Sequence, residues 1–281
     1  MEPMIERDPS AELKAENARL IALLDANGIQ WRMQQPERSS PASAPEPSRL
    51  STDEKVALFR RLFRGRTDVY PIRWEGKTTT KSGYSPACAN EWRAGVCEKP
   101  RIKCGDCSNR MLIPLSDSVI FDHLAGEHTV GVYPLLEDDT CYFLAIDFDE
   151  AEWREDARAF VQSCSELGVP VALEISRSGK GAHAWVFFAG RVSARDARRL
   201  GTAIISHTCS RTRQLKLESY DRLFPNQDTM PKGGFGNLIA LPLQKVPREN
   251  GYRLRQDGRG GSGDRQAWCK RPGTGASHRV A

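Results

Sequence analysis

The clearest element in the pattern of apolar and polar positions is an apolar run that ends on two acidic residues. Residues 141–149 read Cys-Tyr-Phe-Leu-Ala-Ile-Asp-Phe-Asp, a pattern that predicts a buried β-strand. Side chains alternate between the faces of a strand, so Asp147 and Asp149 should point to the same side. Two carboxylates this close are costly to bury unless a cation lies between them, and oxygen ligands suit Mg²⁺ or Mn²⁺. The pair is therefore a candidate metal site, and the alternative is a strand that leads into an acidic turn.

The pattern after this strand predicts a domain of mixed α and β structure. Apolar periodicity and stop signals indicate, in order, a helix at 152–167, a strand at 169–175, a polar turn at 176–181, a strand at 182–188 and a helix at 193–207. A strand, a helix, a hairpin and a second helix in succession are typical of the α/β or α+β class.

The turn at 176–181 reads Ser-Arg-Ser-Gly-Lys-Gly. Glycines let backbone N–H groups approach an anion, and Arg177 and Lys180 add positive charge, so the turn suits phosphate. It is not a P-loop, because the G-x4-G-K-[ST] pattern is absent. His183 begins the next strand, where it is either part of this site or a packed core histidine.

The first 30 residues predict an N-terminal helix. A proline follows an N-cap aspartate at its start, and Gly28 ends it. Leu13 and Leu20 lie seven residues apart, as do Asn17 and Leu24, which is the seam of a short coiled coil with an asparagine at one position. We expect either a homodimer through this helix or a marginal amphipathic helix that packs on its own domain.

The rest of the chain divides by composition. Residues 31–50 are expected to form a flexible linker, because four prolines and four serines lie between Gln34 and Arg49. A capping box at 51–54, Ser-Thr-Asp-Glu, opens the globular domain, which we place at residues 51–247. The segment 248–281 is rich in Gly, Arg, Ser and Gln with almost no apolar pattern, and we expect it to be disordered.

Four cysteines form a candidate zinc knuckle within the domain, as an insert at 88–107. They are Cys88, Cys97, Cys104 and Cys107, and the last two have Cys-x2-Cys spacing. Four thiolates suit a tetrahedral zinc site with no open position, so the role would be structural. Scattered buried cysteines are the alternative.

Composition excludes little more. The chain has 281 residues, a net charge of +5 that permits nucleic-acid binding without requiring it, and eight cysteines. It has no run of 18 apolar residues and no signal-peptide pattern at its start. We therefore expect a cytoplasmic protein whose cysteines are thiols or metal ligands.

The order and spacing of the motifs resemble those of a known family. The segments concerned are the four-cysteine insert, residues 131–136, 144–149, 178–183, 224–228 and 236–243. An acidic pair, a small-x-His element and a later carboxylate resemble the archaeo-eukaryotic primase superfamily. The match is closest to the primase domain of TOTE conflict systems and is similar to other primase-polymerases of mobile elements.

The resemblance implies a primase catalytic core, with an RRM-like sheet joined to a second α/β unit. It assigns Asp147 and Asp149 to the first motif and His183 to the second. For the third we favour Asp228, with Asp221 as its competitor. The implied cofactors are two catalytic Mg²⁺ or Mn²⁺ ions held by the three carboxylates, and Arg177, Ser178, Lys180 and His183 would bind the triphosphate.

Two functions follow from these expectations. The first is a DNA-directed primase-polymerase, a nucleotidyltransferase that uses dNTPs or NTPs on a single-stranded DNA template and primer. Family members often continue into helicase and nuclease domains, so a helicase or nuclease is the expected protein partner. The second is a non-catalytic single-stranded nucleic-acid-binding module with a structural zinc knuckle.

Overall fold

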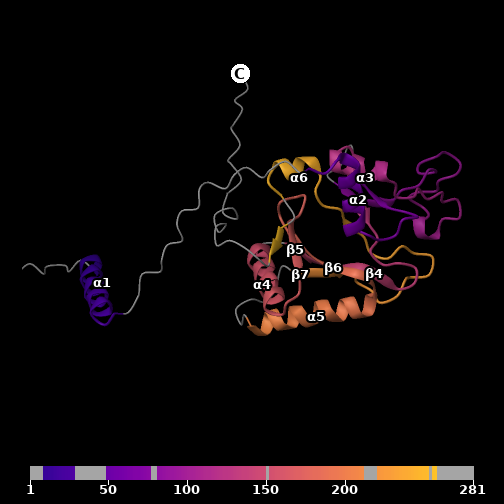
Figure 1. Ribbon diagram of the computed structural model, residues 1–281. Helices are drawn as coiled ribbons and strands as arrows, with labels where there is room; N and C mark the ends of the chain where they lie inside the picture. Colours follow the sequence, from indigo (N-terminus) through magenta and orange to yellow (C-terminus); the bar gives the residue numbers. More distant parts are fainter. Residues whose placement is uncertain are drawn as a thin grey trace, which may run out of the picture. The chain divides into compact units, whose positions relative to one another are not determined.

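The computed structural model describes residues 9–28, 49–76, 81–149, 152–211, 220–252 and 255–257. The chain divides into two units, residues 50–260 and the two terminal segments 1–49 and 261–281, and each is described by itself (Figure 1). In the terminal unit, helix α1 comprises Pro9–Ala26, and Gly28 follows with a φ of 66°. Self-association through α1 stays a prediction, and most of the expected linker and tail lies outside the described residues.

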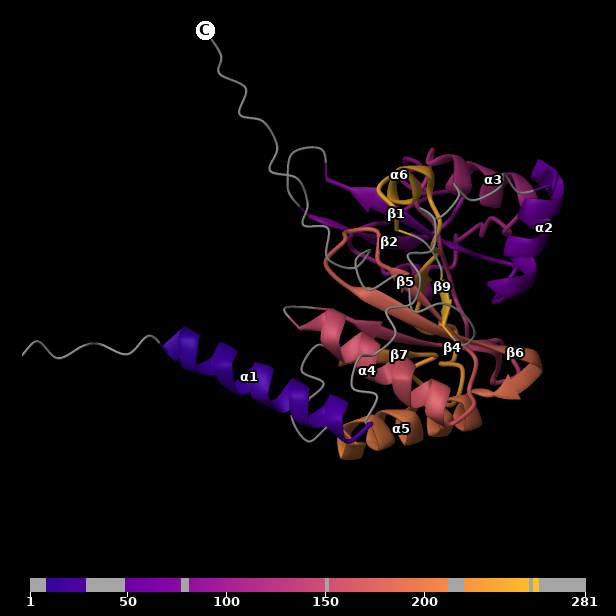
Figure 2. The same cartoon turned by 60° about the vertical axis from the view of Figure 1, so that its left-hand side comes forward.

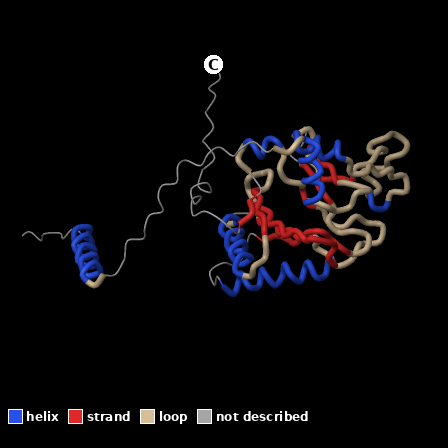
Figure 3. Tube along the Cα trace, viewed as in Figure 1, coloured by secondary structure: helices blue, strands red, loops and turns tan. Residues whose placement is uncertain are grey.

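A five-stranded antiparallel sheet forms the centre of the larger unit (Figure 3). Its strand order is β7-β4-β6-β5-β9. The strands are β4 (Thr140–Phe148), β5 (Val171–Ile175), β6 (Ala182–Ser193), β7 (Tyr220–Phe224) and β9 (Arg255–Asp257). The predicted strand that ends on two aspartates is β4, and the predicted hairpin is the β5–β6 pair.

The edge strand β9 corrects the expected domain boundary. We placed the end of the domain at residue 247 and expected disorder beyond it. Instead α6 (Lys245–Glu249) crosses that boundary, and β9 pairs with β5 along Val171–Leu173. The prediction failed because three residues of backbone pairing need no apolar side-chain pattern.

Two helices cover one face of this sheet. They are α4 (Trp153–Glu166) and α5 (Ala194–Arg211), which lie together on one side in Figure 2. Gly201 of α5 is so close to the sheet that a Cβ there would lie 3.0 Å from Leu144 and 2.9 Å from Leu223. Leu144 and Leu223 thus face the helices, and Asp147, three residues after Leu144, faces the opposite side.

The opposite face of the sheet packs against the N-terminal half of the larger unit. That half contains α2 (Thr52–Leu62), the hairpin β1 (Pro71–Glu75) and β2 (Ser82–Pro86), the short η1 (Cys104–Asp106), α3 (Asp117–Ala125) and β3 (Gly131–Val132). Strand β3 pairs with β8 (Ile239–Ala240), which comes from the C-terminal part of the unit. The predicted capping box is present, since Ser51 and Glu54 hydrogen bond reciprocally at the start of α2. Phe63 then packs edge-on against Trp185 of β6, with 4.9 Å between ring centroids. In the part of the chain that the structure describes, no helix is long and apolar enough to cross a membrane.

Candidate active site

A row of four polar residues crosses the sheet on the face away from α4 and α5. The strand register places Glu174 of β5 opposite His183 of β6, His183 opposite Asp147 of β4, and Asp147 opposite Arg222 of β7. Directly opposed residues of antiparallel strands share a face, so these four side chains are neighbours. The row thus places Asp147, a candidate metal ligand, next to His183, a candidate phosphate-binding residue.

His183 lies between two carboxylates. Its Nδ1 is 2.9 Å from Oε2 of Glu174, and its Nε2 is 3.4 Å from Oδ1 of Asp147. Burial opposes the imidazolium charge, but the nearby charges of Glu174, Asp147 and Asp149 outweigh this effect and raise the pKa of His183. The imidazole therefore holds its second proton more tightly than a free histidine does, and each ring nitrogen that carries a proton can donate a hydrogen bond.

Sequence reasoning missed Glu174. It is buried in β5, and its Oε2 also accepts a hydrogen bond of 3.2 Å from Nε1 of Trp185. The signal that could have identified it is a single charged residue in the otherwise apolar run Val-Ala-Leu-Glu-Ile of residues 171–175. A buried carboxylate needs partners, and an adjacent strand with a histidine and a tryptophan two residues apart offers two.

Two other carboxylates, Asp149 and Asp221, lie near Asp147. Burial raises the pKa of its carboxyl group, and the charges of Asp149 and Asp221 raise it further, whereas His183 and Arg222 act in the opposite direction. Asp149 and Asp221 both lie within electrostatic range of Asp147, and carboxylates gathered in this way are the donors that a hard divalent cation prefers. Among the residues that the structure describes, no three or more His, Cys, Asp or Glu side chains are arranged as a metal site.

The third carboxylate beside this pair is Asp221. The β4–β7 register shifts between Asp147, opposite Arg222, and Phe148, opposite Tyr220, so Asp221 is the extra residue of a β-bulge. Bulges redirect side chains and are common next to active sites. Asp221 pairs with Arg222 at 2.5 Å, within electrostatic range of Asp147.

The structure does not bring Asp228 to this site, which corrects our preferred assignment. Asp228 forms an ion pair with Arg198 of α5. Two residues later, the N–H of Met230 donates to Oδ1 of Asp139, just before β4 begins. Asp147 lies eight residues after Asp139 along the extended chain of β4, which places it roughly 25 Å from Asp139. The sequence distance to the next strand was a poor guide, because the chain after β7 continues in the same direction to the start of β4, away from Asp147.

The phosphate-binding candidates lie at the same end of the sheet as the aspartates. A Cβ added to Gly181 would lie 3.0 Å from Oδ1 of Asp149 and 3.4 Å from Oγ of Ser176, so turn and carboxylate are adjacent. Within the turn, Oγ of Ser178 accepts a hydrogen bond from the N–H of Lys180. Gly179 has a φ of 72° and lies so close to the hydroxyl of Tyr252 that a side chain there would collide.

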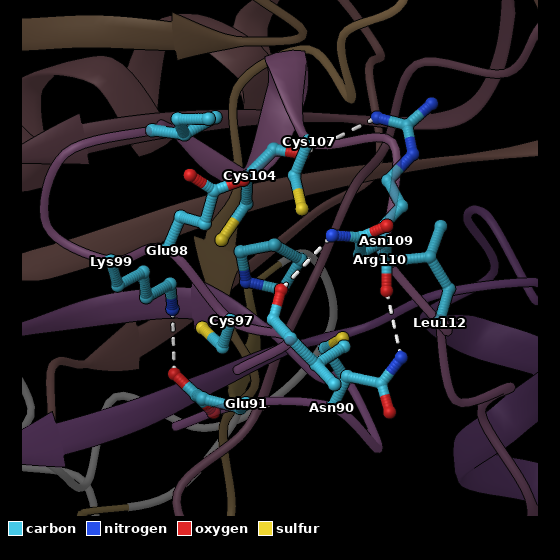
Figure 4. Close-up of a pocket in the computed structure, with 14 residues that line it drawn as sticks. Asn90, Glu91, Cys97, Glu98, Lys99, Cys104, Cys107, Asn109, Arg110 and Leu112 are labelled. Carbon is cyan, nitrogen blue, oxygen red and sulfur yellow. Dashed lines mark hydrogen bonds and ion pairs between the residues drawn. The ribbon is translucent and has the colours of Figure 1, made fainter. Parts of the chain in front are cut away.

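The four cysteines of the insert line one small pocket. Cys88, Cys97, Cys104 and Cys107 all border a cavity of about 20 Å³. Figure 4 labels the last three of them. The N–H of Met111 donates to Sγ of Cys88 at 3.3 Å, and all four cysteines are free thiols. The four predicted ligands thus border one pocket without forming a metal-site arrangement among the described residues.

Comparison with known proteins decides the family. A model of the archaeo-eukaryotic primase domain of TOTE conflict systems matches residues 54–258. The chain belongs to this family. The match reaches past β9, in agreement with the corrected boundary, and the mixed α/β architecture with antiparallel sheets is consistent with the family.

The similarity to a solved structure is weaker. This primase domain is similar to the polymerase domain of Ligase D from Mycobacterium tuberculosis, solved in complex with DNA, with 14% sequence identity and a TM-score of 0.39. The similarity covers 68% of this chain and 72% of that one, and at this distance it supports no argument about function. No curated protein matches this chain.

Proposed function

We propose that this primase domain is a DNA-directed primase-polymerase that transfers nucleotides from dNTPs or NTPs to a primer on a single-stranded DNA template. The observation that supports it most is the clustering of Asp147, Asp149 and Asp221 beside the turn at 176–181. Nucleotidyl transfer needs a cation site next to a phosphate site, and no protein nucleophile.

The catalytic Mg²⁺ or Mn²⁺ would be held by Asp147, Asp149 and Asp221. When bound, such ions stabilise negative charge on the attacking 3′-oxygen and the leaving pyrophosphate. The donor set fits, because the charges of Asp149 and Asp221 raise the pKa of Asp147, and a cation would relieve that repulsion.

The residues on the other side of the site would bind the triphosphate. Arg177 and Lys180 supply positive charge, and backbone N–H groups of the turn and the hydroxyl of Ser178 supply donors. His183, held between its carboxylate partners, would donate from Nε2 to a phosphate oxygen. These donors are placed before the reaction begins, which is how charge developing in a transition state is stabilised.

A structural zinc ion would be held by the four cysteines of the insert. All four border one pocket, and a complete set of four thiolates would leave no position for substrate. The insert would therefore fix the loops of residues 88–107 and take no part in the chemistry.

The decisive experiment is primer-free synthesis on single-stranded DNA with dNTPs or NTPs, in parallel with extension of a supplied primer. Wild-type protein should incorporate nucleotide with Mg²⁺ or Mn²⁺, and the double variant Asp147→Ala/Asp149→Ala should not. Asp196→Ala is a matched control, because this carboxylate lies near the start of α5, far from the row. If wild type and double variant both bind single strands and incorporate nothing, the protein is a non-catalytic binding module instead.

A further inference from the structure

Glu174 makes contacts that a surface carboxylate would not make. It is buried, and one oxygen, Oε2, accepts hydrogen bonds from both Nδ1 of His183 at 2.9 Å and Nε1 of Trp185 at 3.2 Å. A carboxylate buried without partners costs several kcal/mol or more, so these two contacts determine where its side chain lies. Glu174 thus connects a candidate active-site histidine to an interior tryptophan.

Trp185 is a rigid anchor for this carboxylate. Its side chain is fully buried and packs edge-on against Phe63 and Phe143, with centroid separations of 4.9 and 5.2 Å. An indole N–H can only donate, so the ring needs an acceptor when it is buried. Because the indole cannot move, the oxygen that it binds is held in place as well.

The fixed oxygen sets the orientation of the imidazole. With Nδ1 hydrogen bonded to Glu174, rotation of the ring about its Cα–Cβ and Cβ–Cγ bonds is restricted, and Nε2 is directed at Asp147, 3.4 Å away. A carboxylate on one ring nitrogen defines which nitrogen faces the chemistry, as is common for histidines at metal and catalytic sites.

We propose that Glu174 is a positioning residue for nucleotidyl transfer, which acts by holding His183 with Nε2 toward Asp147 and the incoming triphosphate. This proposal rests on the proposed function of the same site. Glu174 itself does not touch substrate. Its effect passes from the packed interior through Trp185, Glu174 and His183 to the row of carboxylates.

Kinetics of two substitutions at residue 174 test the proposal. Glu174→Ala should lower kcat by about 10- to 100-fold, the range seen when the outer partner of a ligating histidine is lost. Glu174→Gln keeps an oxygen that can accept both hydrogen bonds, so it should recover at least about tenfold of that loss. The affinity for single-stranded DNA should stay within about twofold in both variants, because Glu174 is buried and offers no surface to a template.

The matched control is Glu166→Ala, which removes a carboxylate beside another histidine, His207, on the helix-covered side of the sheet. It should leave kcat unchanged. The proposal is overturned if Glu174→Ala retains wild-type kcat, or if the alanine and glutamine variants lose activity, template binding and thermal stability to the same degree, since that pattern means a purely structural role.

A readout independent of activity separates this proposal from the proposed function. Long-range ¹H–¹⁵N NMR of the ring nitrogens, assigned with His183→Asn, should show a protonated, hydrogen-bonded Nδ1 at His183 in wild type and a changed signal in Glu174→Ala. An unchanged signal would overturn the positioning contact. If instead the signal changes while wild-type protein makes no product, the contact is real and the nucleotidyl-transfer function is what fails.

Discussion

His183 and Asp147 face each other across the β4–β6 ladder, with Nε2 of the imidazole 3.4 Å from Oδ1 of the carboxylate. The separation is longer than a good hydrogen bond, so Nε2–H is available for another acceptor. A phosphate oxygen of an incoming nucleotide is the acceptor that this position suits.

Substitution of His183 should therefore affect catalysis and leave template binding intact. His183→Ala should lower kcat by about 100-fold or more, because a donor directed at developing negative charge is lost. Extension assays and a titration with labelled single-stranded DNA on the same variant would check this. Full activity would make His183 a packed core histidine, and lost DNA affinity would place it on the template.

Asp221 and Asp228 should behave differently. Asp221→Asn should reduce incorporation by about 100-fold or more, because it removes a carboxylate from the cation site. Asp228→Asn should leave activity near wild type and change the free energy of unfolding by no more than about 1 kcal/mol, since its ion pair with Arg198 is partly exposed. Incorporation rates and urea unfolding of both variants decide this, and the reverse pattern would restore Asp228 as the third ligand.

The cysteine pocket predicts bound zinc. Freshly purified protein should contain about one equivalent of zinc, and Cys104→Ser or Cys107→Ser should lower both the zinc content and the Tm. Cys209→Ser, at an exposed cysteine of α5, is the matched control and should change neither. Elemental analysis with less than about half an equivalent in the wild type would count against the site, as would two disulfides among the four cysteines.

The lowered pKa of the buried His123 predicts that the folded protein loses stability in acid. Burial, with a contribution from Arg248, lowers the pKa of His123 to about 4, and its Nε2 lies 3.0 Å from the carbonyl oxygen of Pro242 while Nδ1 accepts from the N–H of Val130. The folded pKa is below the unfolded value of 6.5, so the unfolded chain binds the proton more readily and stability falls as pH drops from about 6.5 toward 4.

Between pH 7 and pH 5 this one group should remove about 2 kcal/mol from the free energy of unfolding. Urea unfolding at both pH values would measure the change, and His123→Gln should lack this part of it. An equal slope in wild type and His123→Gln would contradict the prediction.

Local patterns predicted much of the site, and long-range contacts explain what they missed. The run at 141–149 and the turn at 176–181 carry their own signals, because strand alternation and glycine content act over a few residues. Asp221 could not be distinguished from Asp228, because the choice depends on a bulge in the β4–β7 pairing. Glu174 was missed since its importance comes from partners nine and eleven residues away.

The edge strand β9 also sets the shortest chain that should work. A protein cut after residue 247 would lose the backbone partner of Val171–Leu173, next to Glu174, and leave the β5 edge open to pairing with other molecules. It would also lose Tyr252, whose hydroxyl lies against Gly179 of the turn at 176–181. A fragment intended for crystallisation or assay should therefore extend at least through Asp257.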